Sequence, residues 1–177
     1  WYAGDDEGLL RAAIQASLQT HTDPRSIASA VAVACLVGYL ATHPVTTLEA
    51  EHVALQAAIA CVRQSESVLA GEYGISMDGE NPHPPRFSGA LAILEAVWEA
   101  PPWQVLRTIV IEANRQQPDH AIVSPSDGFA CASVPTAIYL ALRSPSFEAA
   151  VTEAVNLGGD ADTVGAMTGA LAGARWG

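Results

Sequence analysis

The 177-residue chain is half apolar, only 15% charged, and carries a formal net charge of -11. Its length suits one domain with a buried core, and its apolar content excludes a disordered chain. The negative charge disfavours nucleic acids and anionic membrane surfaces as partners, because these are themselves negatively charged.

Helical periodicity, with no sustained alternation of period two, predicts a single all-α domain over residues 1–177 with about eight helices. The first five helices are expected at 7–19, from an N-cap at Asp23 to about 41, from a cap at Thr46 or Thr47 to about 69, at 88–98, and onward from Pro101-Pro102. After loops at 71–87 and 117–128, the last three are expected at about 130–142, 147–156 and 162–175.

The second predicted helix is apolar nearly all round, so we expect it to be central in the bundle. Its apolar run, 27–41, is too short to span a membrane.

The cysteines Cys35, Cys61 and Cys131 lie in apolar stretches and have no CxxC spacing. This pattern is typical of buried free thiols in a reducing cytosol. We read no signal peptide and expect a cytoplasmic protein.

A turn between the last two predicted helices carries the sharpest chemical signal. Gly158 and Gly159 let the backbone turn where side chains would clash. Asp160, Asp162 and Thr163 open the next helix and can point hard oxygen ligands into one small volume, which suits Mg²⁺ or Mn²⁺. The alternative is that Asp160 is only an N-cap and Asp162 only complements the helix dipole.

The last predicted helix has glycines at every fourth position, namely Gly165, Gly169 and Gly173. Each costs roughly 1 kcal/mol against alanine in a soluble helix, so three on one stripe predict close packing against another backbone. Such packing would hold the two aspartates rigidly, although tight helix packing alone explains the stripe equally well.

Two further residues are candidates for ligand contact. Phe129 follows Asp127-Gly128 on a loop, where it is either an aromatic offered to a ligand ring or an ordinary core anchor. His21 precedes a capped helix, where it can meet a phosphate or ribose or simply be a capping or surface histidine.

These features occur in segments that resemble one protein family. The segments are Thr20–Arg25, Asp127–Phe129, Val134–Tyr139, Phe147–Val151, Ala154–Thr163, Gly165-Ala166, 169–174 and Gly177. Together they resemble the ADP-ribosylglycohydrolase family, which includes the glycohydrolase that reactivates dinitrogenase reductase and the vertebrate ADP-ribosylhydrolases. The similarity is weaker between residues 45 and 120.

The resemblance implies a compact orthogonal all-α bundle that hydrolyses the glycosidic bond between ADP-ribose and an acceptor such as a protein arginine or serine. It implies two Mg²⁺ or Mn²⁺ ions, with Asp160, Asp162 and Thr163 as ligands of the metal site. It also implies that ADP-ribose, or an ADP-ribosylated substrate, is bound with the help of His21, Gly128, Phe129, Gly158 and Gly159.

The chain departs from the family pattern at its start. Family members carry N-terminal helices with a Thr-Asp-Asp segment that supplies the other metal ligands, and we find no such segment here. We therefore expect the later part of the family domain without its N-terminal helices, and catalytic residues outside this chain. This predicts weak metal binding, little activity, and self-association or a complementing fragment.

Two other functions remain open from the sequence. One is a non-catalytic, ADP-ribose-binding pseudoenzyme with the same ligand site. The other is a structural protein, because the resembling family includes a crystallin relative, and a fold does not by itself imply catalysis.

Overall fold

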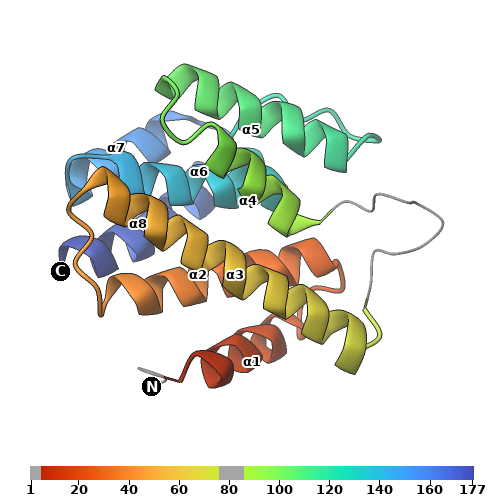
Figure 1. Ribbon diagram of the computed structural model, residues 1–177. Coiled ribbons are helices and arrows are strands. Elements are labelled where there is room, and N and C mark those ends of the chain that lie inside the picture. The colour runs from red at the N-terminus through yellow and green to blue at the C-terminus, as the bar shows by residue number, and fades with distance from the viewer. Residues whose placement is uncertain (1–4, 76–85) are drawn as a thin grey trace.

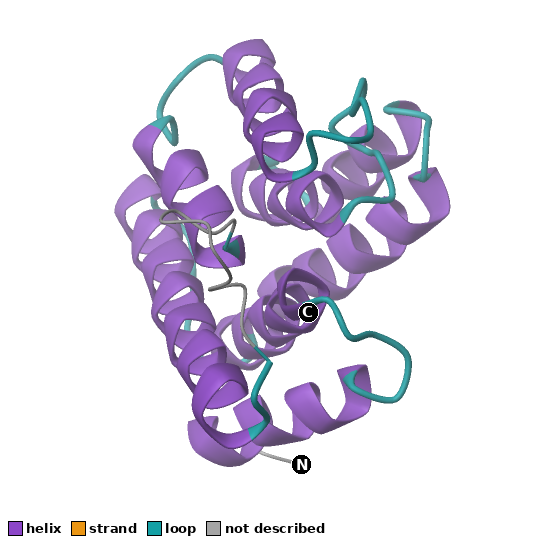
Figure 2. Ribbon diagram, turned by 90° about the vertical axis from the view of Figure 1, so that its right-hand side faces the viewer, coloured by secondary structure: helices purple, strands orange, loops and turns teal. Residues whose placement is uncertain are grey.

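A computed structural model describes residues 5–75 and 86–177, and in these residues it contains eight α-helices and no strand (Figures 1 and 2). The predicted all-α fold is therefore confirmed. The helices are α1 (Asp6–Ser17), α2 (Pro24–Leu40), α3 (Leu48–Glu72), α4 (Phe87–Ala96), α5 (Pro102–Gln116), α6 (Ala130–Arg143), α7 (Phe147–Asn156) and α8 (Ala161–Trp176).

The starts of two helices follow directly from local sequence. The Asp23 carboxylate accepts the backbone N–H of Arg25 at 2.8 Å, and Pro24 is the first residue of α2. The Thr47 hydroxyl accepts the backbone N–H of Ala50 at 3.1 Å at the start of α3. Both side chains satisfy donors that a helix leaves free in its first turn, as the sequence predicted.

Two helices form the centre of the bundle. As expected, α2 is central: it packs against α1, α3, α4, α6 and α8. The more completely buried helix is α6, in which every residue from Cys131 to Leu142 is buried. It packs against α2, α3, α4, α5, α7 and α8. Within the described residues, no helix is both long and apolar enough to cross a membrane.

Helices α7 and α8 pack against each other through the glycine stripe. Cβ atoms added at Gly165, Gly169 and Gly173 would lie 3.2, 3.8 and 3.8 Å from side-chain carbons of Val155, Val151 and Phe147. Close packing is therefore confirmed, but the expected backbone partner is wrong, because the nearest atoms belong to side chains of α7. Only at Gly165 is the approach tighter than ordinary van der Waals contact.

An ion cluster that the sequence did not reveal fixes the C-terminal end of α8. Glu51 of α3 pairs with Arg143 of α6 at 2.8 Å and with Arg175 of α8 at 2.9 Å. The Arg175 side chain is only 4% exposed and also donates to the carbonyl oxygen of Val45 at 3.0 Å. A buried guanidinium needs such partners, so Glu51 joins three helices at one point.

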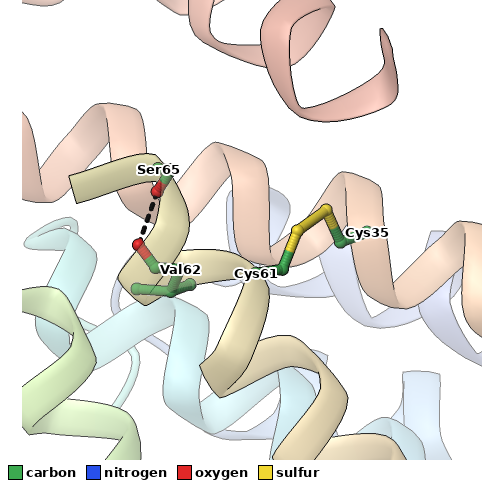
Figure 3. Close-up of a disulfide and its surroundings, with 4 residues drawn as sticks. All are labelled: Cys35, Cys61, Val62 and Ser65. Carbon is green, nitrogen blue, oxygen red and sulfur yellow. Dashed lines mark hydrogen bonds between the residues drawn. A yellow bond between two sulfur atoms is a disulfide. The ribbon is translucent and has the colours of Figure 1, made fainter. Parts of the chain in front are cut away.

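The free-thiol prediction is wrong for two of the three cysteines. Cys35 of α2 and Cys61 of α3 form a disulfide, with their Cα atoms 6.8 Å apart (Figure 3). The reason is that α2 and α3 pack side by side, which a spacing of 26 residues does not disclose. Cys131 is free and buried in α6, as expected.

Candidate functional site

The loop before α6 is fixed to the helices on either side of it. The side-chain amide of Asn114 donates to the carbonyl of Ile122 at 2.7 Å and accepts its N–H at 3.0 Å. The hydroxyl of Thr136, a fully buried residue of α6, donates to the carbonyl of Pro125 at 2.8 Å. The loop therefore presents its next residues, 126–129, in a defined position.

Residue Ser126 joins this loop to the turn before α8. Its hydroxyl donates to the carbonyl of Gly158 at 2.7 Å, and its own carbonyl accepts the N–H of Asp160 at 2.9 Å. Ser126 is fully buried. Two segments about 30 residues apart in sequence thus meet through two hydrogen bonds, one on each side of Gly159.

The glycines at this junction are required by the backbone and by space. Gly158 and Gly159 have φ values of +68° and +63°, in the left-handed region that favours glycine. A Cβ at Gly159 would lie 2.8 Å from the Ser126 hydroxyl and 3.0 Å from its carbonyl oxygen. A Cβ at Gly128 would lie 3.2 Å from Oδ2 of Asp160. The structure therefore brings Gly128, Gly158, Gly159 and Asp160 together.

The two aspartates of the turn have different partners. Asp160 occupies the N-cap position of α8, but its carboxylate accepts no capping hydrogen bond and lies beside Gly128. The alternative that the Asp160 side chain caps α8 is therefore wrong. Oδ1 of the exposed Asp162 accepts the N–H of Thr163 at 3.0 Å. This backbone hydrogen bond holds the pKa of Asp162 below its usual value.

The donor set of this turn fits a hard divalent cation. It offers two neighbouring carboxylates and, from Thr163, an exposed hydroxyl, all at the positive end of a helix dipole. In residues 5–75 and 86–177, no group of three or more His, Cys, Asp or Glu is placed to hold a metal ion. If an ion bound here, these side chains would fill only part of its coordination shell, and further oxygen ligands would have to complete it.

Phe129 is half-buried at the start of α6, where it packs against core residues. The Asp127 carboxylate accepts its N–H at 3.0 Å. The guanidinium carbon of Arg25 lies 5.0 Å from the centre of its ring, close enough for a cation–π contact. Phe129 thus packs as a core anchor, and its contact with a ligand stays a prediction.

Arg25 is a residue of this region that the sequence analysis missed. It donates to both carboxylate oxygens of Asp23, at 3.0 and 2.6 Å, and to the backbone carbonyl of Gln116. Burial works against the charged form of Asp23, but the hydrogen bonds from Arg25 outweigh it, so the pKa of Asp23 is lowered. The Asp-Pro-Arg spacing at the start of α2 was the available signal for this pair.

His21 lies on the loop that leads to Asp23 and is exposed. Its Nδ1 is 2.7 Å from the hydroxyl of Thr20, which is its one side-chain hydrogen bond within the described residues. The structure does not place it against Phe129 or Asp160, so its contact with a ligand stays a prediction.

Cys131 lies two residues after Phe129, and its thiol is buried and protonated. Its Sγ donates to the side-chain oxygen of Gln116 at 3.2 Å. Burial raises the pKa of this thiol to about 12, so it stays protonated near neutral pH. A buried thiol that stays protonated is a poor nucleophile.

Fold and site together define a class: an all-α domain in which a glycine-rich turn presents two carboxylates beside an aromatic-bearing loop. Comparison with protein families shows that residues 1–177 match the family ADP-ribosylglycohydrolase. The chain therefore belongs to the ADP-ribosylglycohydrolase family, whose activity in general is that of a hydrolase. Searches of curated proteins and of solved structures gave no match.

Proposed function

We propose that this domain serves in the metal-dependent hydrolysis of the glycosidic bond between ADP-ribose and a modified acceptor, such as a protein arginine or serine. The observation that carries the proposal is the Asp160 carboxylate, which is free of any capping bond, beside Asp162 and against Gly128. A carboxylate at a helix start normally caps the helix, so one that makes no capping bond can bind another partner.

Asp160, Asp162 and Thr163 are the residues that would hold Mg²⁺ or Mn²⁺, two ions being expected in the complete site. When bound, such an ion polarises a substrate oxygen and balances charge as the glycosidic bond breaks. We assign no general acid or base to the described residues.

The remaining residues of the site would bind ADP-ribose. At Gly158 a Cβ would meet nothing within 4 Å, so a ligand could approach the backbone there. Gly128 would contact the ligand beside the Asp160 carboxylate, and Gly159 lets the turn form against Ser126. The half-buried Phe129 would offer a stacking surface for a base or sugar, while Arg25 lies against its ring. His21, before the N-terminus of α2, would contact a phosphate or ribose.

The test is thermal unfolding with ADP-ribose, with and without Mg²⁺ or Mn²⁺. Ligand at 100 times its dissociation constant stabilises a protein by about 2.7 kcal/mol, which raises Tm by roughly 5–10 °C in a chain of this size. We expect a rise of this order that requires metal and is lost in Asp160→Ala/Asp162→Ala. The matched control is Asp6→Ala/Glu148→Ala, which removes two first-turn acids from other helices.

Each result has a distinct meaning. A metal-independent shift, or one equal in both double variants, would contradict the assigned metal ligands. Absence of any shift with ADP-ribose would contradict the proposal for this chain and favour a structural role. Binding without release of ADP-ribose from a modified arginine or serine peptide would favour the non-catalytic ADP-ribose-binding function.

A further inference from the structure

The hydrogen bond from Ser126 to the turn before α8 reaches much farther along the chain than the bond made by Ser65. Ser65, equally buried, donates to the carbonyl of Val62 at 2.7 Å within its own helix (Figure 3). Ser126 makes a bond of the same length to Gly158, 32 residues away. A bond of the first kind shapes one helix locally, whereas one of the second kind fixes two segments relative to each other.

The Ser126 hydroxyl is itself held in place. The Ser124 hydroxyl lies 2.7 Å from it, and the Ser126 N–H donates to the Ser124 hydroxyl at 3.2 Å. Because the Ser126 hydroxyl donates to Gly158, the Ser124 hydroxyl is left as the donor in the contact between the two serines. This chain of hydrogen bonds ends on the residue that precedes Gly159 and the free Asp160 carboxylate.

We propose that Ser126 is a positioning residue, which sets the Asp160 carboxylate for its cation and holds it beside the loop that carries Gly128 and Phe129. This inference rests on the metal site of the proposed function. Ser126 itself touches neither metal nor substrate. It acts through two hydrogen bonds: its hydroxyl donates to the Gly158 carbonyl, and its own carbonyl accepts the Asp160 N–H. Together these bonds fix the position of the turn relative to the loop. Partners of this kind, one step behind the ligands, orient metal-binding carboxylates.

The experiment compares Ser126→Ala with Ser65→Ala, since each removes one fully buried hydroxyl that makes a 2.7 Å bond to a carbonyl. Mn²⁺ alone is the probe, and its binding is followed by loss of the free-ion signal in electron paramagnetic resonance. We expect Ser126→Ala to weaken Mn²⁺ binding by about 10-fold, whereas Ser65→Ala leaves it unchanged. Both variants should lose similar amounts of thermal stability.

A second readout needs no metal. Hydrogen exchange at the Asp160 amide, which is bonded to the Ser126 carbonyl, should become about 5- to 10-fold faster in Ser126→Ala and stay unchanged in Ser65→Ala. If Ser126→Ala does not fold, Ser124→Ala replaces it. That variant keeps the bond to Gly158 but removes the group that orients it, so smaller changes in the same direction are expected.

The outcomes separate this inference from the proposed function. If wild-type protein binds Mn²⁺ and the Ser126 and Ser124 variants bind it equally well, the positioning role is overturned and the metal site stands. If wild-type protein binds no Mn²⁺, the metal site itself is overturned, and with it the role of Ser126. Unchanged hydrogen exchange at the Asp160 amide in both Ser126→Ala and Ser124→Ala would also overturn the positioning role.

Discussion

Gly158 and Gly159 form a matched pair for testing how the turn before α8 is built. Their φ values are nearly equal, +68° and +63°, but a Cβ at Gly158 meets nothing within 4 Å, whereas one at Gly159 meets the Ser126 carbonyl oxygen at 3.0 Å. Alanine at Gly158 should therefore cost only the left-handed backbone conformation, about 1–2 kcal/mol.

Alanine at Gly159 must also push the turn away from Ser126. Two hydrogen bonds are then lost or lengthened, each worth about 0.5–1.5 kcal/mol, for a total of about 2–5 kcal/mol. With about 2–4 °C per kcal/mol in a chain of this size, Gly159→Ala should lower Tm clearly further than Gly158→Ala.

The assay is urea unfolding of both variants and wild type, with thermal melts beside it. Hydrogen exchange at the Asp160 amide adds a local measure, and we expect it to accelerate in Gly159→Ala far more than in Gly158→Ala. Equal free energies of unfolding for the two variants would refute the reasoning, because they would mean that contact with Ser126 contributes nothing to the turn.

Three further predictions concern the rest of the fold. Reducing the Cys35–Cys61 disulfide, which joins residues 26 apart, should lower the free energy of unfolding by about 3 kcal/mol; identical melts with and without reductant would contradict this. Cys131, with its pKa raised to about 12, should resist maleimide at pH 8 in the folded protein and react in urea, as read by mass spectrometry; rapid labelling of folded protein would show that its burial is wrong. Glu51→Gln leaves the guanidinium of Arg175 without its charged partner and should cost about 3–5 kcal/mol in urea unfolding, whereas a cost below about 1 kcal/mol would mean that the ion cluster is not stabilising.

The features that the sequence predicted correctly are mostly local ones. The helices, the N-caps at Asp23 and Thr47, and the glycine turn depend on residues within one or two helical turns, and their patterns are visible in the chain. The glycine stripe of α8 was also visible in the sequence. Its packing partner was not, because a stripe of small residues predicts close packing without identifying the neighbouring element.

The features that the sequence did not predict all depend on tertiary contacts. The disulfide, the Arg25–Phe129 contact and the Ser126–Gly158 bond each join segments whose proximity follows from how helices cross. No local pattern marks such a partner, as a serine in a loop has the same appearance whether it bonds to its neighbour or to a distant turn. The candidate ligands could therefore be named from sequence, but not the residues that hold them.

Helix α8 is held in place at both of its ends. At one end the Asp160 N–H is tied to Ser126, and at the other Arg175 is tied to Glu51. Its 16 residues span about 24 Å at 1.5 Å per residue. A helix that moves as one body cannot shift along its axis without distorting the contacts at both ends. We therefore expect a change at Glu51 that lets α8 shift along its axis to displace Asp160 at the other end of the helix as well.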